Sequence, residues 1–275
     1  MKRILLAVIA LSGLMTSLAQ DTMVKDKPDT LRIGGMIIIK NDKDDDDNKN
    51  RNITISNRSK RRSSNVSTNW WIVDLGFSQL KDETNYAAAQ SSGFVSTGFG
   101  KDQFDLRLGK SVNVNIWFFM QRLNLVKHVV NLKYGLGLEL NNYRFENETV
   151  RFIKNPTMIS LDNSLAGADK NKLALDYVTV PLMLNFNFTP GRAKGFGFSA
   201  GVSAGLLYSA RQKIKMNDNK SKTHDDFDLE KWKLSYIGEL NLGPIRLYGS
   251  YAMNNMWEKG LHQTPYNVGV RLSNW

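Results

Sequence analysis

From Trp70 onward, apolar and polar residues alternate with a period of two in eight separate runs. The clearest run, VNLKYGLGLELNNYRF at residues 130–145, has Val, Leu or Tyr at every second position as far as residue 140, with Asn, Lys, Gly or Glu between them. This alternation is typical of a β-strand with one apolar and one polar face. The runs predict eight strands, at about residues 70–80, 104–120, 130–145, 173–188, 196–213, 232–242, 245–253 and 266–272.

The predicted strands are long, and their connections alternate in length. Several runs exceed ten residues, whereas globular strands mostly have about 5–6 residues and a tilted bilayer crossing needs about 9–11. Segregation of short turns and long loops to opposite ends is typical of outer-membrane barrels. Short connections near residues 122–129, 189–195 and 243–244 alternate with longer ones near residues 81–103, 146–172, 214–231 and 254–264.

The N-terminus contains the three parts of a secretory signal peptide. Lys2 and Arg3 give a positive head, and an apolar stretch follows from Ile4 to Leu14. Ser17 and Ala19 then place small residues at the −3 and −1 positions of a cleavage site. We therefore expect residues 1–19 to be removed on export; the alternative is a buried N-terminal helix.

Residues 20–69 differ in composition from the rest of the chain. Runs such as NDKDDDDNKNRN and NRSKRRSSNVSTN carry too few apolar groups to offset the entropy lost on ordering. LRIGGMIIIK at residues 31–40 is compatible with one short strand. We expect a flexible, charged periplasmic arm over residues 20–69 and a barrel over residues 70–275. Acidic residues at 42, 44 and 46 have calcium-loop spacing, but the loop's Gly and Glu are missing, which favours a solvated run.

Composition removes several classes of function. The chain of 275 residues has no cysteine, which excludes disulfides, thiolate metal sites and cysteine nucleophiles. Its formal net charge of +11 would suit a nucleic-acid partner, but export argues against that partner. No internal run of about 18 apolar residues is present, so a helical span beyond the N-terminus is not expected.

The alternation also predicts which side chains face the interior of the barrel. The interior of an eight-stranded barrel is just wide enough for side chains to fill it, and unpaired charges there would be costly. We therefore expect a paired charge network that occludes the lumen, made by Asp74, Lys133, Glu139, Lys233, Glu239, Arg246 and Arg271. We expect interfacial aromatic girdles from Trp70, Trp71, Tyr143, Tyr177, Tyr208, Trp232, Tyr251 and Tyr266.

Several segments resemble the PorT-like family of outer-membrane β-barrel proteins. They are the run at 130–145, DYVTVPLMLNFNF at 176–188 with Pro181 in mid-strand, and the glycine-spaced FGFSAGVSAG at 196–205. The final YNVGVRLSNW looks like the aromatic-ended last strand that barrel-assembly machinery recognises. The resemblance covers about residues 70–275. It implies an eight-stranded barrel and a link to protein secretion, and it supplies no catalytic residues.

We therefore predict an all-β protein, an eight-stranded antiparallel up-and-down transmembrane β-barrel in the outer membrane of a Gram-negative bacterium. We expect a monomer without a cofactor, with a structural or interaction role, whose partners are outer-membrane lipids and unidentified envelope proteins. One alternative is a lipid-modifying enzyme that uses His128, His224 or His262, although no serine lies in a G-x-S-x-G elbow. The other alternative is an exported lipocalin-type ligand binder, which needs an apolar lumen.

Overall fold

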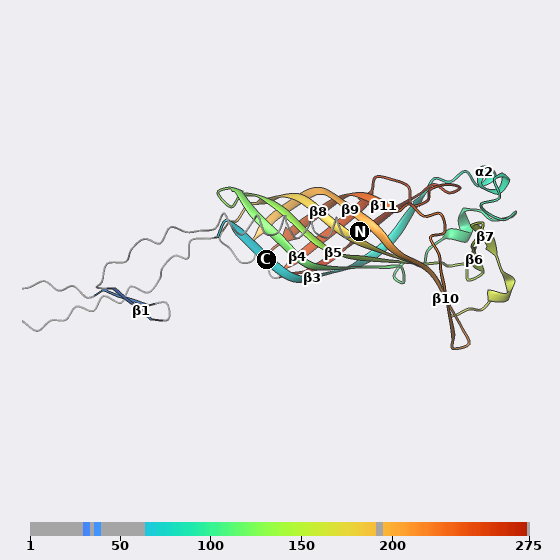
Figure 1. Cartoon of the computed structure of the whole chain (residues 1–275), viewed down its shortest axis with the longest axis horizontal. Helices are drawn as coiled ribbons and strands as arrows, with labels where there is room; N and C mark the ends of the chain where they lie inside the picture. Colours follow the sequence, from blue (N-terminus) through green and yellow to red (C-terminus); the bar gives the residue numbers. More distant parts are fainter. Residues whose placement is uncertain (1–29, 34–35, 40–63, 191–194, 274–275) are drawn as a thin grey trace, which may run out of the picture. The chain divides into compact units, whose positions relative to one another are not determined.

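A computed structural model describes residues 30–33, 36–39, 64–190 and 195–273 (Figure 1). The chain divides into two units, residues 1–63 and 64–275. The predicted signal peptide and most of the predicted arm lie outside the described residues. In the first unit, β1 (Thr30–Ile33) pairs antiparallel with β2 (Met36–Ile39). The segment predicted as one strand is therefore two paired strands.

In the second unit, eight antiparallel strands close into a ring (Figure 1). Each strand pairs with the next ring strand along the chain, and the last pairs with the first. Closure satisfies the backbone hydrogen bonds of every strand without leaving an open sheet edge. The ring strands are β3 (Val66–Asp82), β4 (Val112–Val126), β5 (Val130–Arg144), β8 (Lys170–Asn187), β9 (Phe196–Met216), β11 (Trp232–Leu242), β12 (Ile245–Ala252) and β13 (Gln263–Leu272).

The number of strands predicted from the pattern is confirmed for the ring but is wrong for the whole chain. Three short strands in the long connections were not predicted: β6 (Val150–Ile153), β7 (Met158–Leu161) and β10 (Asn219–His224). Strand β6 pairs with β7, and β10 pairs with the outer part of β9. None of the three belongs to the ring.

Two predicted strand boundaries are also wrong. The second run was expected to begin near Phe104, but residues 101–104 form a 3-10 helix, η1 (Lys101–Phe104), and β4 begins eight residues later. Gly109, with a φ of +71°, reverses the chain between these two elements. The first ring strand begins at Val66, so residues 66–69, which had been assigned to the arm, pair with β4.

Each ring strand has an apolar outer face and a largely polar inner face. On β5, Asn131, Lys133, Glu139 and Asn141 are buried, whereas the apolar residues between them are partly exposed. This arrangement is the reverse of a lipocalin-type barrel, which needs an apolar lumen, and it is typical of a barrel surrounded by lipid. The exposed outer belt includes Val178, Val180, Leu182, Leu184, Phe198, Val202, Leu206, Leu234, Leu240, Leu247, Val268 and Val270.

A local irregularity in β3 exposes two neighbouring tryptophans on the outer face. Trp71 has a φ of 56°, and the pairing of β3 with β4 leaves out Trp71 and Phe118, while β4 shifts its register against β5 at the same place, between Trp117 and Phe119. As a result Trp70 and Trp71 are both exposed, at 63% and 69%. Their rings lie 6.0 Å from Phe119 and 5.8 Å from Phe118 of β4, respectively. This aromatic group is suited to the membrane–water interface.

Two of the aromatic residues predicted for the girdles face inward instead. Tyr143 and Tyr177 are almost completely buried, at 1% and 2% exposure. Tyr143 lies an even number of residues from Lys133 on β5, so both side chains point to the same, inner face. Six of the eight predicted girdle residues are exposed: Trp70, Trp71, Tyr208, Trp232, Tyr251 and Tyr266.

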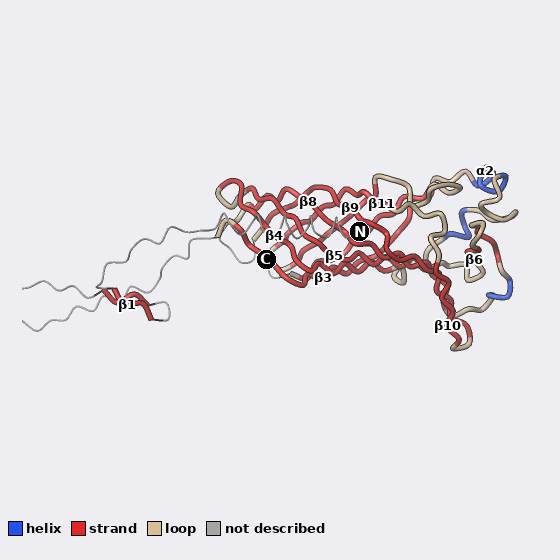
Figure 2. Tube along the Cα trace, in the orientation of Figure 1, coloured by secondary structure: helices blue, strands red, loops and turns tan. Residues whose placement is uncertain are grey.

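The two ends of the ring differ in their connections. Because the ring has an even number of strands, the start of β3 and the end of β13 lie at the same end of the barrel. That end also carries the short turns β4–β5, β8–β9 and β11–β12. The four long connections gather at the opposite end, where Figure 2 shows loops and short helices. These helices are α2 (Tyr86–Ser91), η1 and η2 (Asn163–Leu165). Within the described residues, no helix is both long and apolar enough to cross a membrane.

Candidate functional site

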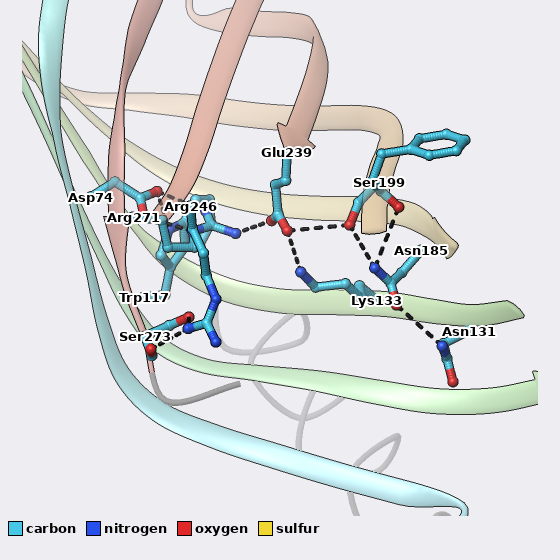
Figure 3. A network of polar contacts seen from close by, with 11 residues as sticks. Asp74, Trp117, Asn131, Lys133, Asn185, Ser199, Glu239, Arg246, Arg271 and Ser273 are labelled. Carbon is cyan, nitrogen blue, oxygen red and sulfur yellow. Dashed lines mark hydrogen bonds and ion pairs between the residues drawn. The ribbon is translucent and has the colours of Figure 1, made fainter. Parts of the chain in front are cut away.

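The ring encloses a network of charged side chains (Figure 3). Six of the seven charged residues predicted to face the interior take part in its ion pairs. Each of the six is less than a tenth exposed, so the charges are removed from water and depend on one another for compensation. They are Asp74, Lys133, Glu139, Lys233, Glu239 and Arg271.

Four of these residues form a continuous chain of ion pairs across the lumen. Arg271 Nε lies 2.6 Å from Asp74 Oδ1, and Arg271 Nη2 lies 2.7 Å from Asp74 Oδ2. The third guanidinium nitrogen, Nη1, pairs with Glu239, whose other carboxylate oxygen pairs with Lys133. The indole of Trp117 donates to Asp74 Oδ2 at 2.8 Å. Arg271 is suited to this position because its planar fork binds two carboxylates at once.

The remaining pair lies beside this chain. Lys233 is ion-paired with Glu139, and its ammonium group lies 4.7 Å from the centre of the Tyr177 ring. Glu139 Oε1 also accepts hydrogen bonds from the amides of Asn141 and Asn267, each at 3.1 Å. The carboxylate therefore has several donors in addition to the lysine, as a buried carboxylate requires.

Asparagines join the two groups of charges. Asn113 donates to Asn115 at 3.0 Å and to Asn141 at 2.8 Å, and Asn115 donates in turn to Asp74 at 3.2 Å. Tyr248 donates to the carbonyl oxygen of the Asn113 side chain. Every ring strand contributes to the network, since β8 adds a contact from Thr179 to Glu139 and β9 adds one from Ser199 to Glu239.

Arg246 is the predicted interior residue that stands apart from these ion pairs. It is partly buried at the short-turn end and donates to the carbonyl and hydroxyl oxygens of Ser273. Arg246, Arg122, Lys133 and Arg271 help to line a cavity of about 50 Å³ there. A second cavity of about 30 Å³ lies deeper in the ring. Volumes of this size hold a few water molecules at most.

The long connections form a second core outside the ring. We call residues 83–111, 145–169, 225–231 and 253–262 the cap. Aromatic contacts join different connections: the Phe152 ring lies 5.4 Å from Phe227 and 6.0 Å from Trp257, to which it is parallel within 6°. The core comprises Ala89, Phe94, Val95, Phe99, Phe104, Phe145, Val150, Phe152, Ile159, Phe227, Leu229, Met256, Trp257 and Leu261, together with the ring residues Tyr143, Leu173, Leu175, Tyr177 and Ala210.

A hydrogen-bonded group attaches the cap to the seam between β3 and β13. Asp82 accepts from Tyr86 Oη at 2.5 Å, from Gln263 Nε2 at 2.8 Å and from the Thr84 backbone at 2.9 Å. Gln263 also accepts from the Trp257 indole at 3.0 Å. Burial by itself raises the pKa of Asp82, but the hydrogen bonds outweigh it and the pKa is lowered overall. Burial and the bond to Asp82 raise the pKa of Tyr86.

The three histidines lie apart from one another. His128 lies in the β4–β5 turn, and His224 is exposed at the end of β10. His262 is exposed in the cap, where its Nδ1 lies 4.0 Å from Glu83. Across the described ranges, no three His, Cys, Asp or Glu side chains gather closely enough to hold a metal ion.

Comparison with known proteins gives a family and a distant structural likeness. The family described as outer membrane protein beta-barrel domain matches residues 49–256, which include seven of the eight ring strands. The crystal structure of Ail, the attachment invasion locus protein of Yersinia pestis, shares 11% identity with a TM-score of 0.29, covering 74% of this chain and 98% of that chain. At that score the likeness carries no argument. No curated protein matches the chain.

The family match and the ring agree with each other. The match extends over most of the chain, and the ring has the apolar outer belt and polar interior that a lipid-embedded barrel requires. The chain therefore belongs to the outer membrane protein beta-barrel domain family, and it lies in the outer membrane of a Gram-negative bacterium.

Proposed function

We propose that this protein is a non-enzymatic outer-membrane barrel that works by binding other envelope components, with the cap as its main binding surface. The observation that carries this proposal is the cap core, to which all four long connections contribute aromatic or aliphatic side chains. Loops that pack on one another present a surface of fixed shape, so less conformational entropy is lost when a partner binds.

The orientation of the barrel supports this role. Short turns face the periplasm in outer-membrane barrels, so the cap lies on the outer side of the membrane. Its surface includes Leu108, which is 73% exposed although it is a large apolar residue. Leu108 is therefore a cap position that a partner protein can reach.

The interior supports a static scaffold in place of a pore. The lumen is filled by a hydrogen-bonded network with contributions from every ring strand, and the two cavities described along it measure about 50 and 30 Å³. A secretion-related role, as the PorT-like resemblance implies, fits a barrel that recruits partners on its two sides. The charged segment that precedes β3, residues 20–65, is the proposed periplasmic contact, because segments of this composition order on partners.

Site-specific photo-crosslinking in whole cells tests the proposal. A photo-reactive amino acid at Leu108, in the cap, should give a discrete adduct with another envelope protein. The same group at Val180, on the lipid-facing side of β8, is the matched control and should give adducts with lipid alone.

An enzyme would behave differently. If Leu108 gives no protein adduct, and the purified protein hydrolyses a lipid or peptide in a reaction that His224→Ala or His262→Ala abolishes, the lipid-modifying alternative replaces the proposal.

A further inference from the structure

Four basic residues stand in one row across four neighbouring strands outside the lipid-facing belt. Arg144 of β5 lies opposite Lys172 of β8, Lys172 opposite Lys213 of β9, and Lys213 opposite Lys222 of β10. Directly opposed side chains on antiparallel strands have Cβ atoms about 4.5–5.5 Å apart, and like charges there are destabilising. A bound anion would relieve the repulsion between three successive like-charge pairs, although Lys172 and Arg144 also donate to the oxygens of Asn142 and Asp169.

A second row lies two residues farther along the same strands. Lys170 of β8 is opposite Lys215 of β9, which is opposite Lys220 of β10. Residues two apart share a face of a strand, so both rows lie on one surface, which we call the basic ladder. Lys215 has carboxylate partners, Asp218 at 2.9 Å and Asp169 at 3.5 Å. Within the described part of the chain, no ion pair with a carboxylate is formed by Lys170, Lys172, Lys213, Lys220 or Lys222.

The ladder faces outward, in line with the lipid-facing belt. On β8, Lys170 and Lys172 lie an even number of residues from Val178 and Val180 and so share their outer face, whereas Leu173 and Leu175 lie on the opposite face and belong to the cap core. The six residues from Val178 to Lys172 span about 20 Å of strand, at about 3.3 Å per residue. With a strand tilt of about 40°, this is about 15 Å along the membrane normal.

This position suits a lipid with a large headgroup. Phospholipid headgroups add only about 5–8 Å to each side of the hydrocarbon core, whereas phosphorylated sugars of a glycolipid extend farther. Figure 1 also shows the β9–β10 hairpin leaning sideways, away from the barrel axis, and Lys220 and Lys222 belong to its second strand, β10.

The electrostatic state of the ladder agrees with an unsatisfied demand for anions. Burial first, and then the charges of Lys170, Lys213 and Arg211, lower the pKa of Lys172 to about 8, although Asp176 opposes the shift. Burial, Arg211, Lys222 and Lys170 likewise lower the pKa of Lys213. An anion with more than one negative charge would relieve this repulsion.

We propose that the basic ladder binds the phosphate groups of phosphorylated glycolipids in the outer leaflet. Lysine ammonium groups contact phosphate oxygens as flexible point charges, and the arginine of the first row adds a planar donor. The ladder would thereby fix a ring-bound glycolipid on the β5–β8–β9–β10 side of the barrel. This inference concerns a lipid site and is independent of the protein-binding role of the cap.

Native mass spectrometry of the full-length mature protein in a neutral detergent tests the inference. The probe is bisphosphorylated lipid A, with its dephosphorylated form as the comparison. Each surface Lys or Arg contributes about 1 kcal/mol to binding an anionic lipid surface, so Lys172→Gln, Lys213→Gln and Lys222→Gln together should weaken binding about 100-fold. The Lys→Arg triple variant at the same positions should retain it.

The matched control removes the same charge from exposed cap lysines: Lys101→Gln, Lys110→Gln and Lys154→Gln. It should bind the phosphorylated lipid as the wild type does, and a folded-band gel shift checks that every variant is folded. Equal binding by the ladder variant and the control overturns the inference. So does equal affinity for the dephosphorylated lipid, full competition by millimolar inorganic phosphate, or preference for a soluble sulfated polysaccharide over lipid A.

Discussion

Arg271 and Asp74 form a two-point ion pair across the seam where the last strand of the ring meets the first. The two nitrogen–oxygen distances are 2.6 and 2.7 Å, and the residues are direct partners in the register of β13 and β3. They are 197 positions apart in the sequence, so the pair forms only when the ring closes. The same guanidinium reaches Glu239 and so connects the seam to the rest of the interior.

Removing this guanidinium should destabilise the barrel strongly. Arg271→Gln leaves the fully buried Asp74 carboxylate without its cation, and breaking a buried ion pair typically costs about 3–5 kcal/mol. Urea unfolding in detergent, followed by tryptophan fluorescence, measures the loss. Arg246→Gln is the matched control, since Arg246 is partly exposed and its hydrogen bonds to Ser273 involve no carboxylate, and it should cost about 1 kcal/mol. Equal losses would contradict the assigned role of the seam.

A methyl group at Gly76 should disturb closure at the same seam. Gly76 is opposite Gly269, and a Cβ at Gly76 would lie 2.4 Å from the Tyr248 hydroxyl and 2.4 Å from the Val268 carbonyl oxygen. We expect Gly76→Ala to cost about 1–3 kcal/mol through overpacking and to lower the temperature at which the folded gel band is lost. Gly249→Ala is the control, because its nearest neighbour would be at 3.6 Å, an ordinary contact. A Gly76→Ala protein as heat-resistant as this control would refute the close packing.

The attachment of the cap should depend on acid pH through Asp82. Its pKa in the folded protein is lowered from 3.8, so its stabilising contribution is complete above about pH 4 and is lost as the pH falls through the folded-state value. Acid-stable protease digestion across pH 2–6 should therefore show cap cleavage rising at the acid end. Asp82→Asn should destabilise the cap by roughly 1–2 kcal/mol at neutral pH and flatten this dependence. An unchanged profile in the variant would remove Asp82 from the explanation.

The filled interior predicts that the barrel does not conduct. Ions would have to displace a network in which six charges are already paired, and the cavities beside it hold only a few water molecules. Planar-bilayer recordings of the purified protein should show no stable single-channel steps. Large, long-lived conductance would mean that the interior opens, and the scaffold role would then have to be abandoned.

Deleting the arm should separate folding from partner binding. Removal of residues 21–63 leaves all of β3, so the barrel should insert and shift on gels as the wild type does while periplasmic partners no longer co-purify. A longer deletion of residues 21–69 also removes the first four residues of β3 and their pairing with β4, and it should reduce heat resistance. If the shorter deletion still co-purifies the same proteins, the arm is not the contact.

Alternation was sufficient to predict the ring strands because one face of each meets lipid. It also predicted the positions of the interior charges, such as Lys133 and Glu239, which the structure brings together. The neutral members of the network, Asn113 and Asn115, also lie on the inward face, but an uncharged side chain carries no sequence signal for an ion-pair network. Strand β10 was missed because NKSKTH is polar on both faces.

The cap could not be predicted in the same way. Its aromatic residues, such as Phe152 and Trp257, come from separate connections without a common period, so their contact depends on how the loops fold together. The residues near Phe104 alternate as in a strand, and this pattern predicted the wrong start for the second ring strand. The Phe104 side chain instead packs in the cap core. Tyr143 and Tyr177 lie near strand ends, which is typical of girdle residues, but their alternation directs them inward, and both are buried.

The turn at Asn217 and Asp218 has a practical consequence for surface display. Both residues have positive φ values, 45° and 65°, and both are exposed at the tip of the β9–β10 hairpin. Neither residue belongs to the cap core. A foreign epitope inserted there would be presented to the outside without disturbing the packed loops. The cap loops are less suitable for such an insertion. They share one core, so an insertion in one loop would disturb the packing of the others.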